Sequence, residues 1–274
     1  MSPSERAALI ACRLAREISD EDVVGVGLGT PLALAAALMA RRSHATGSHL
    51  LVAGALSPDV DLARCLGGAA ALAGATAAFV PHVLTMEMAE RRAMTLQFLR
   101  PAEVDGAGNA NTSRIVAGDG SVRRLPGGLA LADVARILPR IVLYHTDHRP
   151  RSLPARVSFI TSAGGGDALA GTLGPVRLVT DRAVFEFTSR GARLQSLHPG
   201  EEIDRLRDDT GFTFAVDELR VTEAPTEAEL AALQRVDPHA LRELELRATR
   251  DAAAGRLAGL PAAAQAVDAG APAR

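Results

Sequence analysis

The sequence predicts an α/β protein with an open, mainly parallel sheet and helices on both faces. Short apolar or β-branched runs alternate with helical patterns along most of the chain, and parallel strands joined by helices bury both faces of their sheet. With 274 residues, of which 47% are apolar, the chain is long enough to bury a core of its own. We therefore expect a single domain over residues 1–254.

The N-terminal elements have clear start signals. Ser2, Pro3 and Glu5 form a capping-box pattern with proline at the first helical position, and apolar residues at helical spacing extend this helix to residue 18. A β-branched run from Val23 then leads into three glycines, and an Ala- and Leu-rich helix follows over 32–41. This order predicts a strand, a tight loop and a helix.

The rest of the chain continues the alternation and then becomes polar. Apolar runs predict strands over 49–56, 94–99, 140–145, 156–162 and 176–187, and helical patterns lie at 69–75, 84–92 and 130–138. Two further helices are predicted over 227–235 and 238–254. Residues 255–274 are rich in Ala, Gly and Pro, so we expect a disordered tail that buries too little apolar area to offset its ordering entropy.

Composition excludes several classes of function. Thirty basic residues against 32 acidic ones give a net charge of −2, so the chain lacks the positive surface that nucleic-acid binding needs. Every basic residue is Arg, which excludes Schiff-base catalysis by lysine. Neither a signal-peptide pattern nor a long uncharged apolar run is present, so we expect a cytoplasmic protein without a membrane partner.

The metal-ligating residue types are scattered. Cys12 and Cys65 have no C-x-x-C spacing and lie in Ala- and Leu-rich surroundings, which favours small buried residues in a reducing compartment. The histidines show no ligand spacing such as H-x-x-x-H. We expect no metal and no bound cofactor.

The first candidate binding feature is the glycine loop Gly25-x-Gly27-x-Gly29 between the first strand and the next helix. Backbone amides at a helix N-terminus favour an anionic group. The spacing is not the G-x-G-x-x-G of a dinucleotide site, and a phosphate-binding loop of the Walker type needs a lysine. A tight structural turn and a loop beside a phosphate or carboxylate ligand both remain open.

The second candidate feature is a turn-forming loop, in which Asp105, Gly108, Asn109 and Asn111 follow one another at short spacing. The order Asp-x-x-Gly-Asn-x-Asn-Thr closely resembles the D-x-x-G-N-x-N-T-T signature of family I CoA-transferase subunits. We call residues 105–113 the signature loop.

Further segments match that family in the same order over residues 20–247. The segment over 124–135, with Gly127 and Gly128, resembles the family's P-G-S-G-G-A-N-D segment with residues lost from the glycine stretch. The segments over 148–151, 156–162, 179–187, 197–200, 210–212 and 237–242 follow in the family's order. The closest match is the β (B) subunit of the glutaconate CoA-transferase type, including subunits associated with steroid-ring catabolism.

The resemblance implies half of an enzyme. A CoA-transferase α subunit would be the partner in a heterodimer or heterotetramer, and an acyl-CoA thioester would be the substrate. Gly25, Gly27, Gly29, Gly54, Gly127 and Gly128 would then contribute to substrate or CoA binding.

One departure from the family affects the mechanism. The family's β subunit attacks the thioester with a glutamate near the end of an early strand, but the matching positions here are Ala53, Gly54 and Ala55. Asp59 and Asp61 lie beyond a proline and are expected to cap the next helix. Three functions remain open: a transferase with another nucleophile, an acyl-CoA hydrolase of the ring-cleaving type that uses a partner carboxylate, and a non-catalytic structural subunit.

Overall fold

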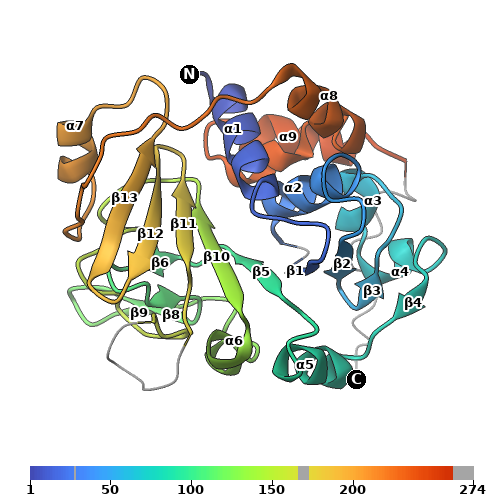
Figure 1. Ribbon diagram of the computed structural model, residues 1–274, viewed down its shortest axis with the longest axis horizontal. Helices are drawn as coiled ribbons and strands as arrows, with labels where there is room; N and C mark the ends of the chain where they lie inside the picture. Colours follow the sequence, from blue (N-terminus) through green and yellow to red (C-terminus); the bar gives the residue numbers. More distant parts are fainter. Residues whose placement is uncertain (28, 166–172, 262–274) are drawn as a thin grey trace. The chain divides into compact units, whose positions relative to one another are not determined.

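The computed structural model describes residues 1–27, 29–165 and 173–261, and the chain divides into two compact units (Figure 1). Unit 1 consists of Met88–Ala224 with Met1, and unit 2 consists of Ser2–Glu87 and the segment that begins at Pro225. The single domain over 1–254 stays a prediction. Residues 262–274 of the expected tail lie outside the described residues.

Unit 2 begins with the predicted capping box. α1 (Pro3–Ala15) has Ser2 as its N-cap. The Ser2 hydroxyl accepts the Glu5 backbone N–H at 3.2 Å, and the Glu5 carboxylate accepts the Ser2 N–H at 2.7 Å. The helix is confirmed, although it ends at Ala15 and not at residue 18.

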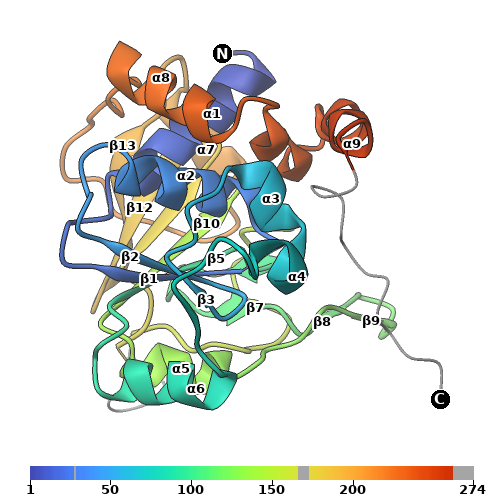
Figure 2. The same ribbon diagram turned by 90° about the vertical axis from the view of Figure 1, so that its right-hand side faces the viewer.

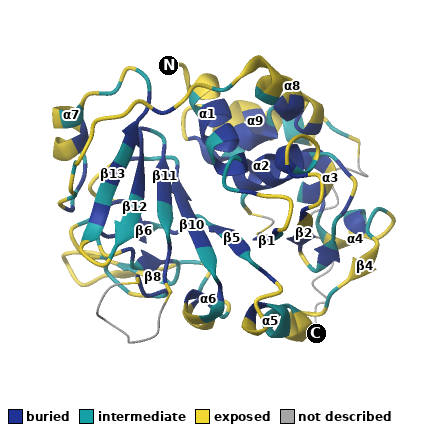
Figure 3. Ribbon diagram, viewed as in Figure 1, coloured by how far each residue is buried: buried dark blue, intermediate teal, exposed yellow. Residues whose placement is uncertain are grey.

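The core of unit 2 is built around α2 (Pro31–Arg41), in which every residue from Pro31 to Ala40 is buried. A helix that is apolar on all sides has to be enclosed on all sides. Its neighbours are α1, α3 (Leu62–Leu66), α8 (Glu227–Val236), the 3-10 helix η1 (Leu241–Glu245), β1 (Val23–Val26) and β2 (His49–Val52). Figure 2 shows α2 lying over β1 and β2, and Figure 3 shows its burial.

The strands of unit 2 change from parallel to antiparallel pairing. β1 and β2 pair in parallel, with Gly25 opposite Leu51, whereas β2, β3 (Ala55–Leu56) and β4 (Ala78–Phe79) pair in antiparallel fashion. The single strand predicted over 49–56 is therefore wrong. Ala53 and Gly54 have φ values of 48° and 82°, and two successive positive φ values reverse the chain in a two-residue hairpin turn.

The C-terminal helices of unit 2 differ from their prediction in one place. The helix predicted over 227–235 is α8, but the helix predicted over 238–254 is wrong, because η1 and α9 (Arg250–Ala258) replace it. The Asp237 carboxylate accepts the backbone N–H groups of Leu241 at 2.7 Å and Arg242 at 3.1 Å, which holds a tight turn there. α9 continues past residue 254, where the tail was expected to begin.

Unit 1 contains a five-strand segment of sheet in the order β13-β12-β11-β10-β5. β10 pairs in parallel with both β5 and β11, while β12 and β13 are antiparallel. The bounds are β5 (Leu96–Leu99), β10 (Arg140–His145), β11 (Arg177–Thr180), β12 (Ala183–Thr188) and β13 (Gly191–Leu197).

Two strand predictions in unit 1 need correction. The run over 176–187 divides into β11 and β12, because the Thr180 hydroxyl accepts the N–H groups of Arg182 at 3.1 Å and Ala183 at 2.9 Å and so holds a turn. The strand predicted over 156–162 is wrong, since this segment makes only the single bridge between Ala110 and Ser162.

Shorter elements complete the fold. Two hairpins, β6 (Glu103–Val104) with β7 (Ala110–Asn111) and β8 (Arg114–Val116) with β9 (Val122–Arg124), lie in unit 1, and the second projects outward (Figure 2). The helices predicted over 69–75, 84–92 and 130–138 correspond to α4 (Gly68–Leu72), α5 (His82–Glu90) and α6 (Leu131–Ile137), while α7 (Ile203–Asp208) was not predicted.

The predicted α/β class with a mainly parallel central sheet is confirmed. None of the helices in the described ranges has both the length and the apolar character that spanning a bilayer requires.

Candidate active site

The first glycine loop and the β2–β3 turn follow adjacent strands of unit 2. Val26 pairs with Val52, so Gly27 and Ala53 leave neighbouring parallel strands at the same edge, where ligands bind in open α/β sheets. A Cβ atom at Gly27 would have Thr30 Oγ1 as its nearest neighbour at 3.7 Å, and at Gly29 it would meet nothing within 4 Å. Both glycines therefore leave open space at this edge.

The N-terminus of α2 is already bonded by the chain itself. The backbone N–H of Leu32 donates to the Glu245 carboxylate at 2.8 Å, and Glu245 is only 4% exposed. A carboxylate at this position neutralises part of the positive end of the helix. Backbone amides at this helix end were expected to favour an anionic group. For the Leu32 amide, that group is the carboxylate of Glu245 from the same chain.

The β2–β3 turn, where the family resemblance places a glutamate, carries no carboxylate. Gly54 has a φ of 82°, and a Cβ atom there would lie 2.9 Å from the Val80 carbonyl oxygen. Ala55 is fully buried, whereas Ala53 is exposed. Of these three positions, only residue 53 could direct a longer side chain outward.

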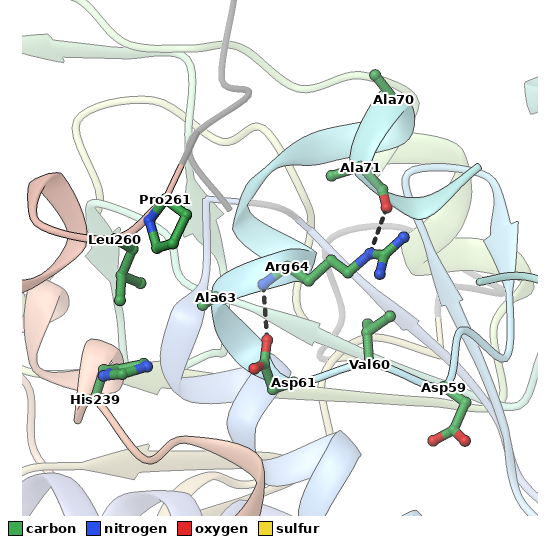
Figure 4. A pocket seen from close by; sticks show the side chains of 10 residues that line it. All are labelled: Asp59, Val60, Asp61, Ala63, Arg64, Ala70, Ala71, His239, Leu260 and Pro261. Atoms are coloured by element: carbon green, nitrogen blue, oxygen red, sulfur yellow. Dashed lines mark hydrogen bonds between the residues drawn. The ribbon is translucent and has the colours of Figure 1, made fainter. Parts of the chain in front are cut away.

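Asp59 and Asp61 have structural partners. The Asp61 carboxylate caps α3 by accepting the Arg64 N–H at 2.9 Å, as predicted. Asp59, which is mostly exposed, pairs with Arg42 at 2.8 Å. Both line a cavity of about 690 Å³ in unit 2, in which His239 faces Asp61 and the Arg64 side chain extends toward the carbonyl of Ala71 (Figure 4).

In unit 1, the signature loop is held together by its own polar side chains. The Asp105 carboxylate accepts the backbone N–H groups of Ala107 and Asn109 and the side-chain amide of Asn109, each at 3.1 Å. Asn109 Oδ1 in turn accepts the Gly164 N–H at 2.9 Å. Gly108 has a φ of 80°, and a Cβ atom there would lie 2.9 Å from Pro175. Asp105, Gly108 and Asn109 therefore shape the loop.

The last signature residue belongs to a buried hydrogen-bond cluster. Asn111 is fully buried and donates to the Glu103 carboxylate at 2.7 Å. Glu103 also accepts the N–H and the hydroxyl of Ser158, at 2.9 and 2.7 Å. Removing one partner would leave a buried polar group unsatisfied, so this cluster fixes the loop to the 156–162 segment.

The second glycine feature packs against the end of the signature loop. The Gly127 N–H donates to the Thr112 carbonyl at 2.9 Å, and a Cβ atom at Gly128 would lie 2.8 Å from Thr161 Cγ2. Gly127, Leu129 and Ala130 have positive φ values of 108°, 31° and 61°, a strained backbone of the kind found at ligand sites. We call residues 127–130 the glycine turn.

The glycine turn has two backbone amides without an acceptor among the described residues and one exposed apolar side chain. Within the described residues, the N–H groups of Gly128 and Leu129 donate to no backbone or side-chain acceptor. The Leu129 side chain is 82% exposed. Two adjacent free amides suit an oxyanion.

Two buried histidines mark the end of β10: His145 is its last residue, and His148 lies three residues beyond it. Burial lowers the pKa of His148 to about 3, with a further contribution from Arg182, and lowers the pKa of His145 to about 4, with a contribution from Arg100. His148 bonds Thr180 Oγ1 at 2.9 Å and Thr210 Oγ1 at 2.8 Å. His148 therefore stays neutral and links two hydroxyls of unit 1.

The thiols and the metal-ligating side chains offer no catalytic group here. Burial raises the pKa of both Cys12 and Cys65 to about 12, so neither forms the thiolate that nucleophilic attack requires. Within the described residues, no three His, Cys, Asp or Glu side chains are grouped so that they could hold a metal ion.

Comparison with known proteins places this geometry in a family. No protein-family model matches the chain. The B subunit of glutaconate CoA-transferase from Acidaminococcus fermentans is 26% identical over 247 residues, which are 83% of this chain and 91% of that protein. A structure of the decarboxylase AibA/AibB, in a variant with one cysteine replaced by valine, has 30% identity and a TM-score of 0.79, and the match covers 90% of this chain and 99% of that one. The chain belongs to the CoA-transferase family.

A second curated relative agrees with this assignment, and a further solved structure shares the fold. The B subunit of 3-oxoadipate CoA-transferase from Pseudomonas knackmussii is 33% identical over 152 residues, which are 51% of this chain and 57% of that protein. The structure of IpdAB from Rhodococcus jostii has a TM-score of 0.71 at 20% identity and covers 90% of this chain and 98% of that one, which shows a shared fold. The two curated relatives are both B subunits, and this CoA-transferase chain is of the same type.

The predicted site residues divide into two sets, and each set lies within one unit. Gly25, Gly27, Gly29 and Gly54 lie in unit 2, whereas the signature loop, Gly127 and Gly128 lie in unit 1. Sequence reasoning missed Glu245 as the partner of α2, although it lies shortly after the matched 237–242 segment. It also missed the free amide of Leu129, because hydrogen bonding of backbone amides leaves no trace in the residue pattern.

Proposed function

We propose that this chain is the B subunit of a heteromeric CoA-transferase-family enzyme, and that it acts on an acyl-CoA thioester together with an A-type partner subunit. The match to the B subunit of glutaconate CoA-transferase along 91% of that protein supports this function most directly. The partner and the thioester are carried over from the named relatives. A cytoplasmic location and a substrate from steroid-ring catabolism stay predictions.

The glycine turn is the proposed oxyanion site. A thioester carbonyl gains negative charge on its oxygen when the carbonyl carbon is attacked or when an enolate forms next to it. The free N–H groups of Gly128 and Leu129 can donate to that oxygen, and donors of this kind lower the barrier most when the backbone is fixed in advance. The bond from Gly127 to Thr112 and the close fit of Gly128 against Thr161 provide that fixation.

The proposed nucleophile or base comes from the partner subunit. The β2–β3 turn carries no carboxylate, and its geometry at Gly54 leaves no room for one. A partner carboxylate would attack the thioester in a transferase. In a hydrolase, it would act as a general base on water.

Decarboxylation is a second candidate, favoured by the 30% identity to the decarboxylase AibA/AibB over 99% of that chain. When the acyl group of a CoA thioester carries a carboxylate at the β position or the vinylogous position, breaking the carbon–carbon bond to that carboxylate releases CO₂ and leaves an enolate, which needs stabilisation of its oxygen and a proton donor. It needs no glutamate in the β2–β3 turn. The amides of Gly128 and Leu129 would serve this reaction equally well.

The test combines the chain with its A-type partner and a panel of acyl-CoA thioesters, with and without an acceptor acid. CoA transfer that depends on the acceptor supports a transferase, release of free CoA without an acceptor supports a hydrolase, and release of CO₂ with the thioester intact supports a decarboxylase. Borohydride reduces an enzyme-bound glutamyl-CoA thioester and shows which subunit carries it. Modification of this chain would contradict the assignment of the nucleophile to the partner.

A control separates a catalytic role of this chain from a merely structural one. If the A-type partner alone is as active as the mixture, the chain only supports its partner. If neither the partner alone nor the mixture turns over any thioester in the panel, the proposed function is wrong for these substrates.

A further inference from the structure

Four loops of unit 1 line an open cavity of about 640 Å³, and the start of the signature loop is one of them. The loops are the start of the signature loop, the 155–156 segment, the turn between β12 and β13, and the 211–213 segment after α7. A Cβ atom at Gly106 would lie 3.1 Å from Phe212, so two of these walls are in close contact. We call this cavity the arginine pocket, after Arg156 and Arg190.

Two guanidinium groups from separate loops line the arginine pocket. Arg156 and Arg190 are both exposed, and within the described residues neither side chain forms an ion pair or a hydrogen bond. The arginines of unit 1 at positions 149, 151, 182 and 193 are instead paired with carboxylates. An unpaired guanidinium keeps its full capacity to bind an anion.

The carboxylate in the arginine pocket does not compete for these arginines. Asp105 is only 5% exposed, and both of its oxygens accept N–H groups of its own loop. The hydroxyls of Ser189 and Thr213 also line the cavity. The free donors are thus two guanidinium forks and two hydroxyls, a set that matches the oxygens of a phosphate group.

The signature loop connects the arginine pocket to the glycine turn. Asn109 lines the pocket, and Thr112, three residues later, accepts the Gly127 N–H. Three residues span at most about 11 Å. A ligand that is long, flexible and phosphorylated at one end can therefore reach both places within unit 1.

We propose that the arginine pocket binds the phosphate groups of a nucleotide-type ligand. The ligand that we assign is the coenzyme A thioester, and this assignment rests on the proposed function. Its phosphorylated adenosine end would bind in the pocket, and its pantetheine arm would lead to the glycine turn. The other source of the same chemistry is a free phosphorylated metabolite or inorganic phosphate.

The test measures binding of adenosine 3′,5′-bisphosphate to the full chain, alone and with its A-type partner, by isothermal titration calorimetry. Each charge-assisted contact to phosphate contributes about 1.5–3 kcal/mol, so Arg156→Gln and Arg190→Gln should each weaken binding about tenfold or more. Arg123→Gln is the matched control, because Arg123 is exposed on β9 of the same unit and is not part of the pocket. It should leave the affinity unchanged.

Four results would overturn the proposal or its assignment to coenzyme A. Absence of bisphosphate binding by the chain with and without its partner would do so, as would equal affinity of both pocket variants and the wild type. Inorganic phosphate that binds as tightly as the bisphosphate would overturn the coenzyme A assignment. Bisphosphate binding that both variants weaken supports the pocket even if no thioester is turned over. Turnover with an unchanged KM for the acyl-CoA thioester in both variants refutes the pocket without contradicting the proposed function.

Discussion

Replacing His148 by glutamine should reduce the pH dependence of the stability of unit 1. The native pKa of His148 is about 3 and that of His145 about 4, against an ordinary value of 6.5. Because both native pKa values are lowered, the unfolded chain binds more protons than the native one below pH 6.5. The stabilisation is complete above that pH and is lost as the pH falls toward 4 for His145 and 3 for His148.

The expected magnitude follows from these pKa values. Between about pH 7.5 and pH 5.5, each unfolded imidazole gains close to one proton that the native one does not accept. The difference in bound protons is large only between about pH 6.5 and pH 5.5, which is one pH unit. At about 1.4 kcal/mol per pH unit, each histidine therefore lowers the free energy of unfolding by about 1.4 kcal/mol over this range. The two together lower it by about 3 kcal/mol. Carboxylates contribute little in this window, because their ordinary pKa values lie below it.

The assay is urea unfolding at several pH values, followed by tyrosine fluorescence. The chain has one tyrosine and no tryptophan. Tyr144 is fully buried in β10, next to His145, so its emission reports on unit 1. His148→Gln should lower the stability at pH 7.5, because it changes the bonds to Thr180 and Thr210, and it should remove about half of the loss between pH 7.5 and pH 5.5.

The control is His82→Gln, since His82 is exposed and should leave the pH dependence unchanged. A variant that merely disturbed packing would shift the stability by the same amount at both pH values. An unchanged difference between pH 7.5 and pH 5.5 in His148→Gln would therefore refute the claim that a neutral buried imidazole causes it.

Three other predictions concern the candidate site and its surroundings. Glu245→Gln should destabilise unit 2 by about 1–2 kcal/mol, measured by urea unfolding followed by circular dichroism, because the first turn of α2 loses its charged partner; an unchanged midpoint would contradict this role. Gly54→Ala should cost about 1–3 kcal/mol in the same assay, whereas Ala53→Gly should be neutral or slightly stabilising, and equal effects of the two changes would show that the turn is not strained. Cys12 and Cys65 should react with a thiol reagent at pH 8 only after urea is added, and rapid reaction of the native chain would contradict their burial.

Local signals predicted most helices of this fold because the information lies within a few residues. The Ser2 and Glu5 capping box sets the start of α1, and the Ala- and Leu-rich composition of 32–41 predicts the helix that is observed as α2. The helix predicted over 238–254 is wrong because that prediction used local periodicity alone. Its helical periodicity is real, but the Asp237 carboxylate binds two N–H groups in space and imposes a tighter turn than periodicity can reveal.

Strands were predicted less accurately because pairing partners are distant in sequence. The run over 49–56 contains no polar residue after His49, yet Ala53 adopts a positive φ that alanine rarely takes. The partner of Gly54 is the Val80 N–H, which donates to its carbonyl at 2.7 Å and lies 26 residues further along the chain. No pattern within the run contains that bond.

The candidate site shows the same division between local and distant information. The order of Asp105, Gly108 and Asn109 was sufficient to indicate a shaped loop, because these residues bond one another. The order of these residues in the sequence does not show whether any of them can act as a catalytic group. Asp105 is the most prominent carboxylate of the signature loop, but its oxygens are occupied by the loop itself, so it cannot act as a base without unmaking the turn. In the described part of the glycine turn and the arginine pocket, the groups left free are the amides of Gly128 and Leu129, two guanidinium groups and the hydroxyls of Ser189 and Thr213. The amides and the guanidinium groups donate hydrogen bonds, so they stabilise negative charge but cannot attack a carbonyl carbon. None of these free groups is a carboxylate, and this is the physical reason to seek the attacking carboxylate on the partner subunit.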